Sequence, residues 1–460
     1  MELFVDLWRH DGGGPLRRRL EHEIREAVRA GRLLPGTELP SSRVLAAQLG
    51  VSRGLVVEAY SQLVAEGYLS ARQGAGTVVA ARAGAGIAKA PAPRVPAAQP
   101  ALRYDFRAGV PDLSAFPRAA WLAAGARSLR ALPDARLGYG DARGAIELRE
   151  ALAAYLGRAR GVVADPERVL VCGGTRDGLC VVWRVLAEAG VRRVAIENPG
   201  WRAQHETVLQ AGLEPVAVAV DGRGLCVEEL MVLDVGAVVL TPAHQFPSGV
   251  ALAPERRAAL LEWAGRSGSI LVEDDYDAEY RYDRDPIGAL QGMAPEHVVY
   301  AGSASKTLAP ALRLGWLLLP ARLAGPAARH RELSGRGEPL LAQMAFADLI
   351  GSGELDRHLR RTRRRYRDRR DALVAAVAAS LPGAAVAGIA AGLHAVVRLP
   401  AGADEAATVR TAAARGIAVE GLGAFHHAGA PAHPSLVLGY ANLPEAAIAR
   451  GIAELAAAVR

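Results

Sequence analysis

The chain has 460 residues, too many for one small domain and enough for two or three. Apolar residues make up 51% and charged residues 22%, which is typical of globular proteins and excludes a disordered chain. The net charge of +7 permits a nucleic-acid partner without requiring one. The three cysteines lack metal-binding spacing, and no signal peptide or membrane span is evident. We therefore expect a cytoplasmic protein without a metal or a membrane partner.

Residues 80–103 separate two kinds of sequence pattern. The stretch is mainly Ala, Pro and Gly and has almost no large apolar side chain, so it cannot bury enough surface to fold. Short helical segments precede it, and apolar β-rich runs alternating with helical segments follow it. The sequence thus predicts a domain over 1–80, a flexible linker over 81–103 and a large domain over 104–460.

The first domain is predicted to begin with a helix within residues 14–33, where apolar side chains recur at helical spacing. A second helix follows a cap at Ser41 or Ser42, and Gly50-Val51 forms a turn. Ser52 then caps a third helix. Two short helices around a glycine turn indicate a helix-turn-helix motif.

Residues 68–80 are predicted to form a hairpin, with Gly74 and Gly76 at its tip. The capping serines and nearby arginines would place N–H groups and positive charge where DNA phosphates lie. The alternative is a helical dimerisation module whose arginines are merely solvated.

The phrases LPSSRVLAAQLGVSR, VVEAYSQLVAEGYL and RQGAGT resemble the winged-helix domain of GntR-family transcription regulators over nearly all of residues 12–80. The resemblance implies that the domain binds duplex operator DNA as part of a dimer. The residues it implies for contacts with the backbone and groove are Ser41, Arg43, Ser52 and Arg53, with Arg72 and Gly74 in the wing.

The large domain is predicted to be an α/β domain with a mainly parallel sheet covered by helices, because apolar runs alternate with helical segments. The runs are residues 168–172, 193–197, 215–220, 236–241, 269–274, 297–301 and 314–319.

Lys306 is one of only two lysines in an arginine-rich chain, and the other, Lys89, lies in the predicted linker. Arginine stays charged, whereas a desolvated lysine can lose its proton and attack a carbonyl group. Lys306 is therefore a candidate for a Schiff base with a cofactor, and the alternative is a surface lysine retained by chance.

Other motifs near predicted strand ends could complete a pyridoxal phosphate site. The acidic segment 272–282 could pair with a pyridine nitrogen, and the glycine turn within 170–179 could hold a phosphate on backbone N–H groups. Trp201 could stack on the ring. Each motif alone is weak, but the carboxyl ends of parallel strands meet where α/β sheets bind ligands.

From about residue 104 the chain resembles fold-type I aminotransferases, on the phrases LGYGDARGAIELREALAAYL, TPAHQFPSG and SASKTLAPALRLGW. A GntR domain joined to such a domain resembles the MocR/GabR group of bacterial regulators. The resemblance implies a C-terminal α+β subdomain, a homodimer, and Lys306 forming the internal aldimine with pyridoxal 5'-phosphate. The other implied cofactor residues are Asp274 at the pyridine nitrogen, Tyr276, Trp201, His244, Gly174, Thr175, Ser303, Ser305, Arg313 and, from the partner subunit, Tyr139.

One departure from the resemblance concerns the ligand. Aminotransferases have an arginine in a phrase like LRLGFA that clamps the carboxylate of the amino acid, whereas here Val437 stands in LVLGYA. Arg398 is a candidate replacement. We therefore expect little transamination of ordinary amino acids.

Three functions remain open at this point. The first is a regulator that senses pyridoxal phosphate or an amine adduct of it, with vitamin B6 supply as the specific hypothesis and RNA polymerase open as a further partner. The second is an active aminotransferase that carries a DNA-binding domain, and the third a DNA-binding protein that no longer uses the cofactor. The arginine run 357–373 favours a solvated, ion-paired helix over a DNA contact, because its arginines extend over nearly five turns.

Overall fold

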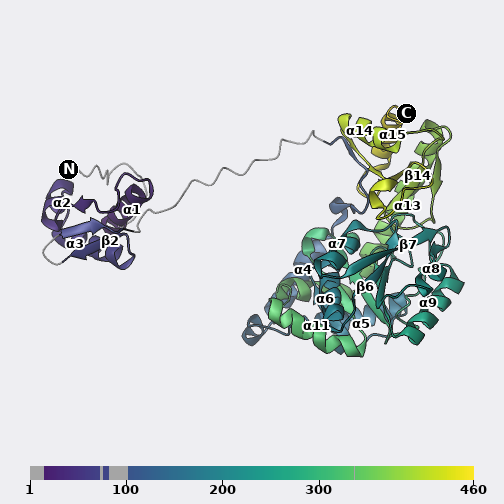
Figure 1. Cartoon of the computed structure of the whole chain (residues 1–460), viewed down its shortest axis with the longest axis horizontal. Helices are drawn as coiled ribbons and strands as arrows, with labels where there is room; N and C mark the ends of the chain where they lie inside the picture. Colours follow the sequence, from purple (N-terminus) through teal and green to yellow (C-terminus); the bar gives the residue numbers. More distant parts are fainter. Residues whose placement is uncertain (1–14, 73–75, 82–101, 336, 460) are drawn as a thin grey trace. The chain divides into compact units, whose positions relative to one another are not determined.

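The computed structural model describes residues 15–72, 76–81, 102–335 and 337–459. The chain divides into two compact units, Met1–Gln99 and Pro100–Arg460 (Figure 1). Most of the predicted linker lies outside the described residues, but Arg103 at its end donates its backbone N–H to Gly416 and pairs with Glu454 at 2.7 Å. The last linker residue is therefore already fixed to the large unit. Among the described residues, no helix has the length and apolar character needed to cross a membrane.

The N-terminal unit packs three helices against a small antiparallel sheet of order β1-β3-β2. Its core is made of apolar side chains from all three helices, including Leu20, Leu45 and Leu63, each fully buried. Gly50 ends the second helix in the left-handed conformation that the predicted turn requires. The elements are α1 (Leu16–Arg29), β1 (Glu38–Leu39), α2 (Ser42–Leu49), α3 (Arg53–Ala65), β2 (Leu69–Arg72) and β3 (Gly76–Val79).

The large unit is built on an eight-stranded sheet in which β12 and β8 run antiparallel to their neighbours and the other strands are parallel. Its strands are buried on both faces, as the continuous apolar runs predict, except β7, most of whose residues are only partly buried or exposed. In order across the sheet they are β5 (Val169–Cys172), β12 (Gly315–Leu318), β11 (Val298–Ser303), β10 (Ile270–Asp275), β9 (Ala237–Leu240), β6 (Arg193–Asn198), β7 (Glu214–Asp221) and β8 (Gly224–Leu225).

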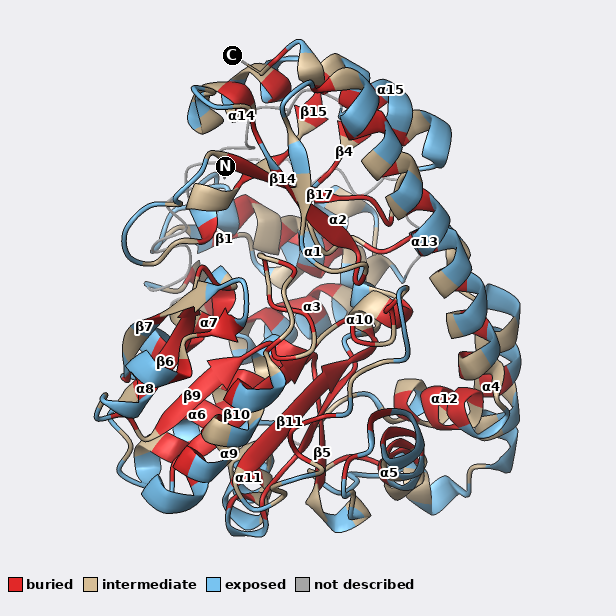
Figure 2. Cartoon of the chain, turned by 90° about the vertical axis from the view of Figure 1, so that its right-hand side faces the viewer, coloured by how far each residue is buried: buried red, intermediate tan, exposed pale blue. Residues whose placement is uncertain are grey.

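Helices cover both faces of this sheet. On one face lie α6 (Thr175–Glu188), α7 (Arg202–Gln210) and α11 (Ala321–Ser334). On the other lie α5 (Ile146–Arg160), α8 (Val227–Met231), α9 (Pro254–Ser267) and α12 (Leu340–Gly351), and α4 (Arg118–Ala131) packs on α12. Figure 2 shows the central strands buried along their length, whereas α9 is exposed on its outer side.

A C-terminal subdomain completes the large unit and is reached through the long helix α13 (Glu354–Ser380). Its antiparallel sheet has the order β13-β14-β17-β16, and β4 pairs in parallel with β15 beside it. The remaining elements are β4 (Tyr104–Asp105), β13 (Ala385–Ala387), β14 (His394–Arg398), α14 (Glu405–Ala414), β15 (Ile417–Ala418), β16 (Glu420–Gly421), β17 (Ser435–Gly439) and α15 (Glu445–Ala456). This architecture, a small unit of three helices and an antiparallel sheet followed by an α/β unit with a C-terminal α+β subdomain, agrees with the predicted fold class.

Candidate functional site

A cavity of about 270 Å³ lies at the carboxyl ends of β10 and β11, where the sequence motifs were expected to meet. Strand ends, turns and helix starts from across the sheet contribute to it, which is the usual position of a ligand site in an α/β fold. The predicted residues that line it are Gly174, Thr175, Trp201, Asp274, Tyr276, Ser303, Ser305, Lys306 and Arg313.

Lys306 stands in the single turn α10 (Ala304–Thr307), directly after β11. Its Nζ donates a hydrogen bond to the carbonyl oxygen of Gly109 at 2.6 Å. A side chain at position 109 would put Cβ 2.9 Å from that nitrogen, and the φ of +76° also favours glycine. Burial lowers the pKa of Lys306, while Asp277 and Asp274 oppose the shift. The amine therefore loses its proton more readily than that of an exposed lysine.

Asp274 is the last but one residue of β10 and is only 4% exposed. One carboxylate oxygen, Oδ2, accepts a hydrogen bond from Gln204 Nε2 at 3.0 Å, but Oδ1 is buried and has no partner among the described residues. Burial raises the pKa of Asp274 to about 7, and the Gln204 hydrogen bond opposes this. An unpaired buried acceptor next to a lysine fits a ligand with a protonated ring nitrogen, as pyridoxal phosphate has.

The opposite end of the cavity is suited to an anion. Gly174 and Thr175 stand at the N-terminus of α6, where backbone N–H groups and the helix dipole attract negative charge. Ser303 donates its hydroxyl to Ser305 Oγ at 2.7 Å, and Arg313 lines the same region. No carboxylate among the described residues pairs with Arg313. These groups fit the phosphate of the cofactor.

Sequence reasoning missed several residues of this site. Gly109 and Ala108 come from the beginning of the large unit, and nothing in the local pattern marks them. Gln204, in the first turn of α7, fixes Asp274 although it resembles an ordinary helix residue. Phe246 also lines the cavity. It belongs to the phrase TPAHQFPSG, so the resemblance could have identified it.

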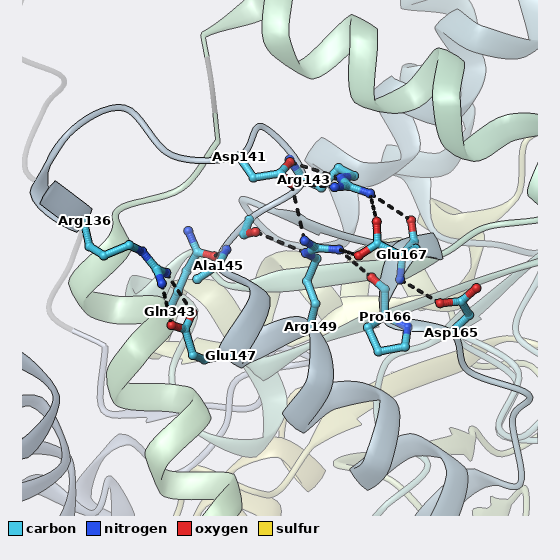
Figure 3. Close-up of polar contacts among 11 residues, drawn as sticks. Arg136, Asp141, Arg143, Ala145, Glu147, Arg149, Asp165, Pro166, Glu167 and Gln343 are labelled. Atoms are coloured by element: carbon cyan, nitrogen blue, oxygen red, sulfur yellow. Dashed lines mark hydrogen bonds and ion pairs between the residues drawn. The ribbon is translucent and has the colours of Figure 1, made fainter. Parts of the chain in front are cut away.

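His244 and Tyr139 do not line this cavity. His244 is buried behind Tyr276, whose hydroxyl lies 3.1 Å from His244 Nδ1. Tyr139 is 92% exposed and borders a separate hollow. Figure 3 shows the ion pairs near that segment, with Arg136 on Glu147 and Arg143 on Asp141 and Glu167. The role predicted for Tyr139 in a partner subunit therefore stays a prediction.

The position expected to hold a carboxylate-binding arginine is apolar. Val437 is fully buried in β17, between Val396 of β14 and Glu420 of β16. Arg398, the candidate replacement, is exposed at the end of β14 and does not line the cavity. The arginines that do line it are Arg176, which pairs with Glu206, and Arg313 at the anion end.

In the N-terminal unit, the predicted caps form. Ser41 Oγ accepts the backbone N–H of Val44 at 3.4 Å, and Ser52 Oγ accepts that of Leu55 at 3.3 Å. Arg43 and Arg53 are exposed in the first turns of α2 and α3.

Within residues 15–72 and 76–81, neither Arg43 nor Arg53 has an ion-pair partner, so both guanidinium groups can reach a phosphate. In the wing, Arg72 ends β2, and Gly74 lies outside the described residues.

The arginine run lies on α13, where its members differ in environment. Arg369 is buried and pairs with Asp112 at 3.0 Å, and Arg365 pairs with the same carboxylate at 2.8 Å. Arg357 pairs with Glu354 in the first turn. Arg360 and Arg361 are exposed. Several of these arginines therefore stabilise the helix itself or its contact with the segment that carries Asp112.

Comparison with known proteins gives two family matches. Residues 16–79 match the gntR family of bacterial regulatory proteins, and residues 105–455 match aminotransferase class I and II. A pyridoxine biosynthesis transcriptional regulator of Corynebacterium glutamicum is 34% identical over 96% of this chain and 95% of its own. A probable rhizopine catabolism regulatory protein, MocR, of Rhizobium meliloti is also 34% identical, over 97% and 94%.

Solved structures resemble the large unit. The α-aminoadipate aminotransferase of Thermus thermophilus, complexed with a phosphopyridoxyl-leucine, has a TM-score of 0.69 and 26% identity. The match covers 77% of this chain and 91% of that protein.

Proposed function

Because this chain belongs to the MocR-type transcription regulators, in which a gntR-family domain is joined to an aminotransferase class I and II domain, we propose that it senses pyridoxal 5'-phosphate or an amine adduct of it. The observation that carries this proposal is that Lys306 and the unpaired Oδ1 of Asp274 belong to one cavity. A surface lysine retained by chance would not share a cavity with a buried, unpaired carboxylate oxygen.

In this proposal each end of the cavity has a distinct task. When bound, the cofactor supplies an aldehyde carbon that amines can attack and a pyridine ring that withdraws electrons. Lys306 would hold it covalently, Asp274 would accept a hydrogen bond from the ring nitrogen, and Trp201 would stack on the ring. Thr175, Ser303, Ser305 and Arg313, together with the N-terminus of α6, bind the phosphate.

The N-terminal unit binds operator DNA through the exposed Arg43 and Arg53, with Arg72 acting from the wing. We propose that the protein is a homodimer, as the large unit's resemblance to fold-type I enzymes supports. The two winged helices of one dimer would then bind two half-sites with higher avidity than one.

Val437 stands between Val396 and Glu420 on the neighbouring strands, and neither can pair with a carboxylate, which supports an effector without a carboxylate at the usual place. A carboxylate buried there unpaired would cost several kcal/mol. Pyridoxal phosphate itself satisfies this condition, and the relative of Corynebacterium glutamicum is named for pyridoxine biosynthesis. Control of vitamin B6 supply is therefore the specific pathway that we propose.

The test compares binding of the protein to DNA from its own promoter region with and without pyridoxal phosphate, by fluorescence anisotropy. We expect the cofactor to change the affinity or the size of the complex in the wild type but not in Lys306→Ala. Lys89→Ala is the matched control and should behave as the wild type. An equal response of wild type and Lys306→Ala would contradict the proposal.

The alternative, an active aminotransferase, is tested by adding common amino acids and γ-aminobutyrate to the cofactor-loaded protein. We expect little change in its visible spectrum and little release of keto acid. Ready turnover would show that another group replaces the missing arginine.

A further inference from the structure

The outward face of α3 in the N-terminal unit departs from the usual composition of an exposed helix surface. Over residues 53–60 the exposed positions are Arg53, Gly54, Val57 and Glu58, while the opposite side of the helix packs into the core. Val57 is 43% exposed. Glycine and valine are both poorer helix formers than alanine, and at exposed positions the core gains nothing from them.

Gly54 has no structural reason to be a glycine. Its φ is not in the left-handed region, and a Cβ built on it would meet no other atom within 4 Å. An alanine would therefore fit the fold without strain. The missing side chain leaves an open notch on the helix surface, bordered by Val57 three residues on and Glu58 four residues on. A local rule that is broken without a structural reason points to function.

The charges around the notch indicate which part of a DNA duplex it would face. The Glu58 side chain is 71% exposed, and its ion-pair partner Arg17 lies 3.8 Å away. A carboxylate repels phosphate but can accept hydrogen bonds from the amino groups at base edges. The second helix of a helix-turn-helix places its N-terminal residues against base edges in the major groove. The exposed Arg43 and Arg53 thus suit phosphates, whereas the notch suits a base.

We infer that the notch above Gly54 receives the 5-methyl group of a thymine, with Val57 as its apolar wall. Of the four DNA bases, only thymine presents an apolar group in the major groove. Gly54 provides the space for that methyl group and Val57 provides the contact, so the two residues determine sequence specificity. The inference rests on the proposed function for the binding of DNA, and it adds the base that the N-terminal unit reads.

The first experiment replaces thymines by deoxyuridine, which lacks only the methyl group. Footprinting of the full-length protein on its own promoter DNA locates the protected segment, and each thymine in it is then replaced in turn. Affinities are measured by fluorescence anisotropy, at the cofactor concentration that gives the tighter binding. We expect one thymine in each half-site to matter, with a loss of affinity of about fourfold for each methyl group removed.

Two variants assign this effect to the notch. Val57→Ala removes the apolar wall, so it should bind thymine and deoxyuridine operators equally. Gly54→Ala fills the notch, so it should bind the thymine operator more weakly than the wild type does but the deoxyuridine operator equally well. Gly325→Ala is the matched control, because Gly325 is also exposed within a helix, α11, and a Cβ there would meet nothing within 4 Å. It should keep the thymine dependence of the wild type.

The second experiment needs no DNA. Thermal unfolding should show that Gly54→Ala raises the melting temperature of the N-terminal unit by about 2 to 8 °C, since the alanine loses less backbone entropy on folding. A lower melting temperature would mean that the fold requires the glycine, and this overturns the inference.

The results on DNA separate the inference from the proposed function. An equal loss of affinity by Gly54→Ala on both operators would mean that the notch admits the sugar-phosphate backbone, and it overturns the inference. An unchanged thymine dependence in Val57→Ala also overturns it. Specific binding by the wild type that does not depend on any thymine methyl group contradicts the inference alone. If the wild type binds no DNA, the proposed function fails and the inference fails with it.

Discussion

In the N-terminal unit, Arg43 and Arg53 stand exposed at helix N-termini, whereas in the large unit Lys306 lines a cavity and Asp274 is buried beside it. The exposed arginines interact with a partner through solvent, so salt should weaken their contacts. The enclosed pair has pKa values shifted by burial, so pH should govern it. One unit is thus built for a long charged surface and the other for one small ligand.

The largest effect is expected from Asp274→Ala in the enclosed site. Removing one partner of a buried charged pair costs about 3 to 5 kcal/mol, so the affinity for pyridoxal phosphate should fall about a hundredfold or more. Titration of the cofactor followed by absorbance measures this. Asp368→Ala, at an exposed position on α13, is the control and should bind as the wild type. Equal affinities of the two variants would show that Asp274 does not hold the ring.

The exposed site is tested by the double variant Arg43→Ala/Arg53→Ala. We expect weaker binding to every DNA sequence. The slope of log affinity against log salt concentration should fall in magnitude by about two, because each phosphate contact contributes roughly one to it. Anisotropy titrations at several salt concentrations provide the slope.

Arg360→Ala/Arg361→Ala on α13 is the matched pair and should leave affinity and slope unchanged. If the α13 pair loses affinity and the first pair keeps it, the large unit rather than the winged helix carries the DNA contacts.

A smaller effect is expected from Glu197, a carboxylate buried near Asp274. Its pKa is raised to about 7 by burial, against hydrogen bonds from Thr241 and Gln245. The folded protein thus binds more protons than the unfolded chain between about pH 4.5 and 7. The free energy of unfolding therefore falls as the pH rises through this window.

Glu197→Gln removes this titration, so its stability relative to the wild type should rise by about 2 kcal/mol from pH 5 to pH 9. Thermal unfolding of the cofactor-free protein at both pH values measures the difference. A stability difference that does not depend on pH would mean that Glu197 stays ionised throughout.

The smallest effect is expected at the cap of α3. Ser52→Ala leaves the N–H of Leu55 without its partner, which should cost about 1 kcal/mol of the N-terminal unit's stability. Ser61→Ala, at an exposed position inside the same helix, should cost nothing because alanine is the better helix former. Calorimetry of the full chain would resolve the unfolding of this unit. An equal shift for both variants would argue against the cap.

The sequence was sufficient to predict a residue's role where that role depends only on the helix or strand to which the residue belongs. Ser52 caps a helix because of its position before an apolar stripe, and Asp274 ends a run of strand residues, so both could be predicted locally. Gly109 and Gln204 could not, because they meet Lys306 and Asp274 only through the tertiary fold. His244 shows the same limit, since its motif predicted a place beside the ring but did not reveal its contacts with Asp277 and Tyr276, which the tertiary fold brings about.

The central claim, that Lys306 carries the cofactor, is tested most directly by borohydride reduction of the protein incubated with pyridoxal phosphate, followed by peptide mass spectrometry. The chain contains only Lys306 and Lys89 as side-chain amines, so the result is unambiguous. We predict a pyridoxyl group on the peptide that contains Lys306 and none in Lys306→Ala. Modification of Lys89 instead, or of neither lysine, would contradict the account.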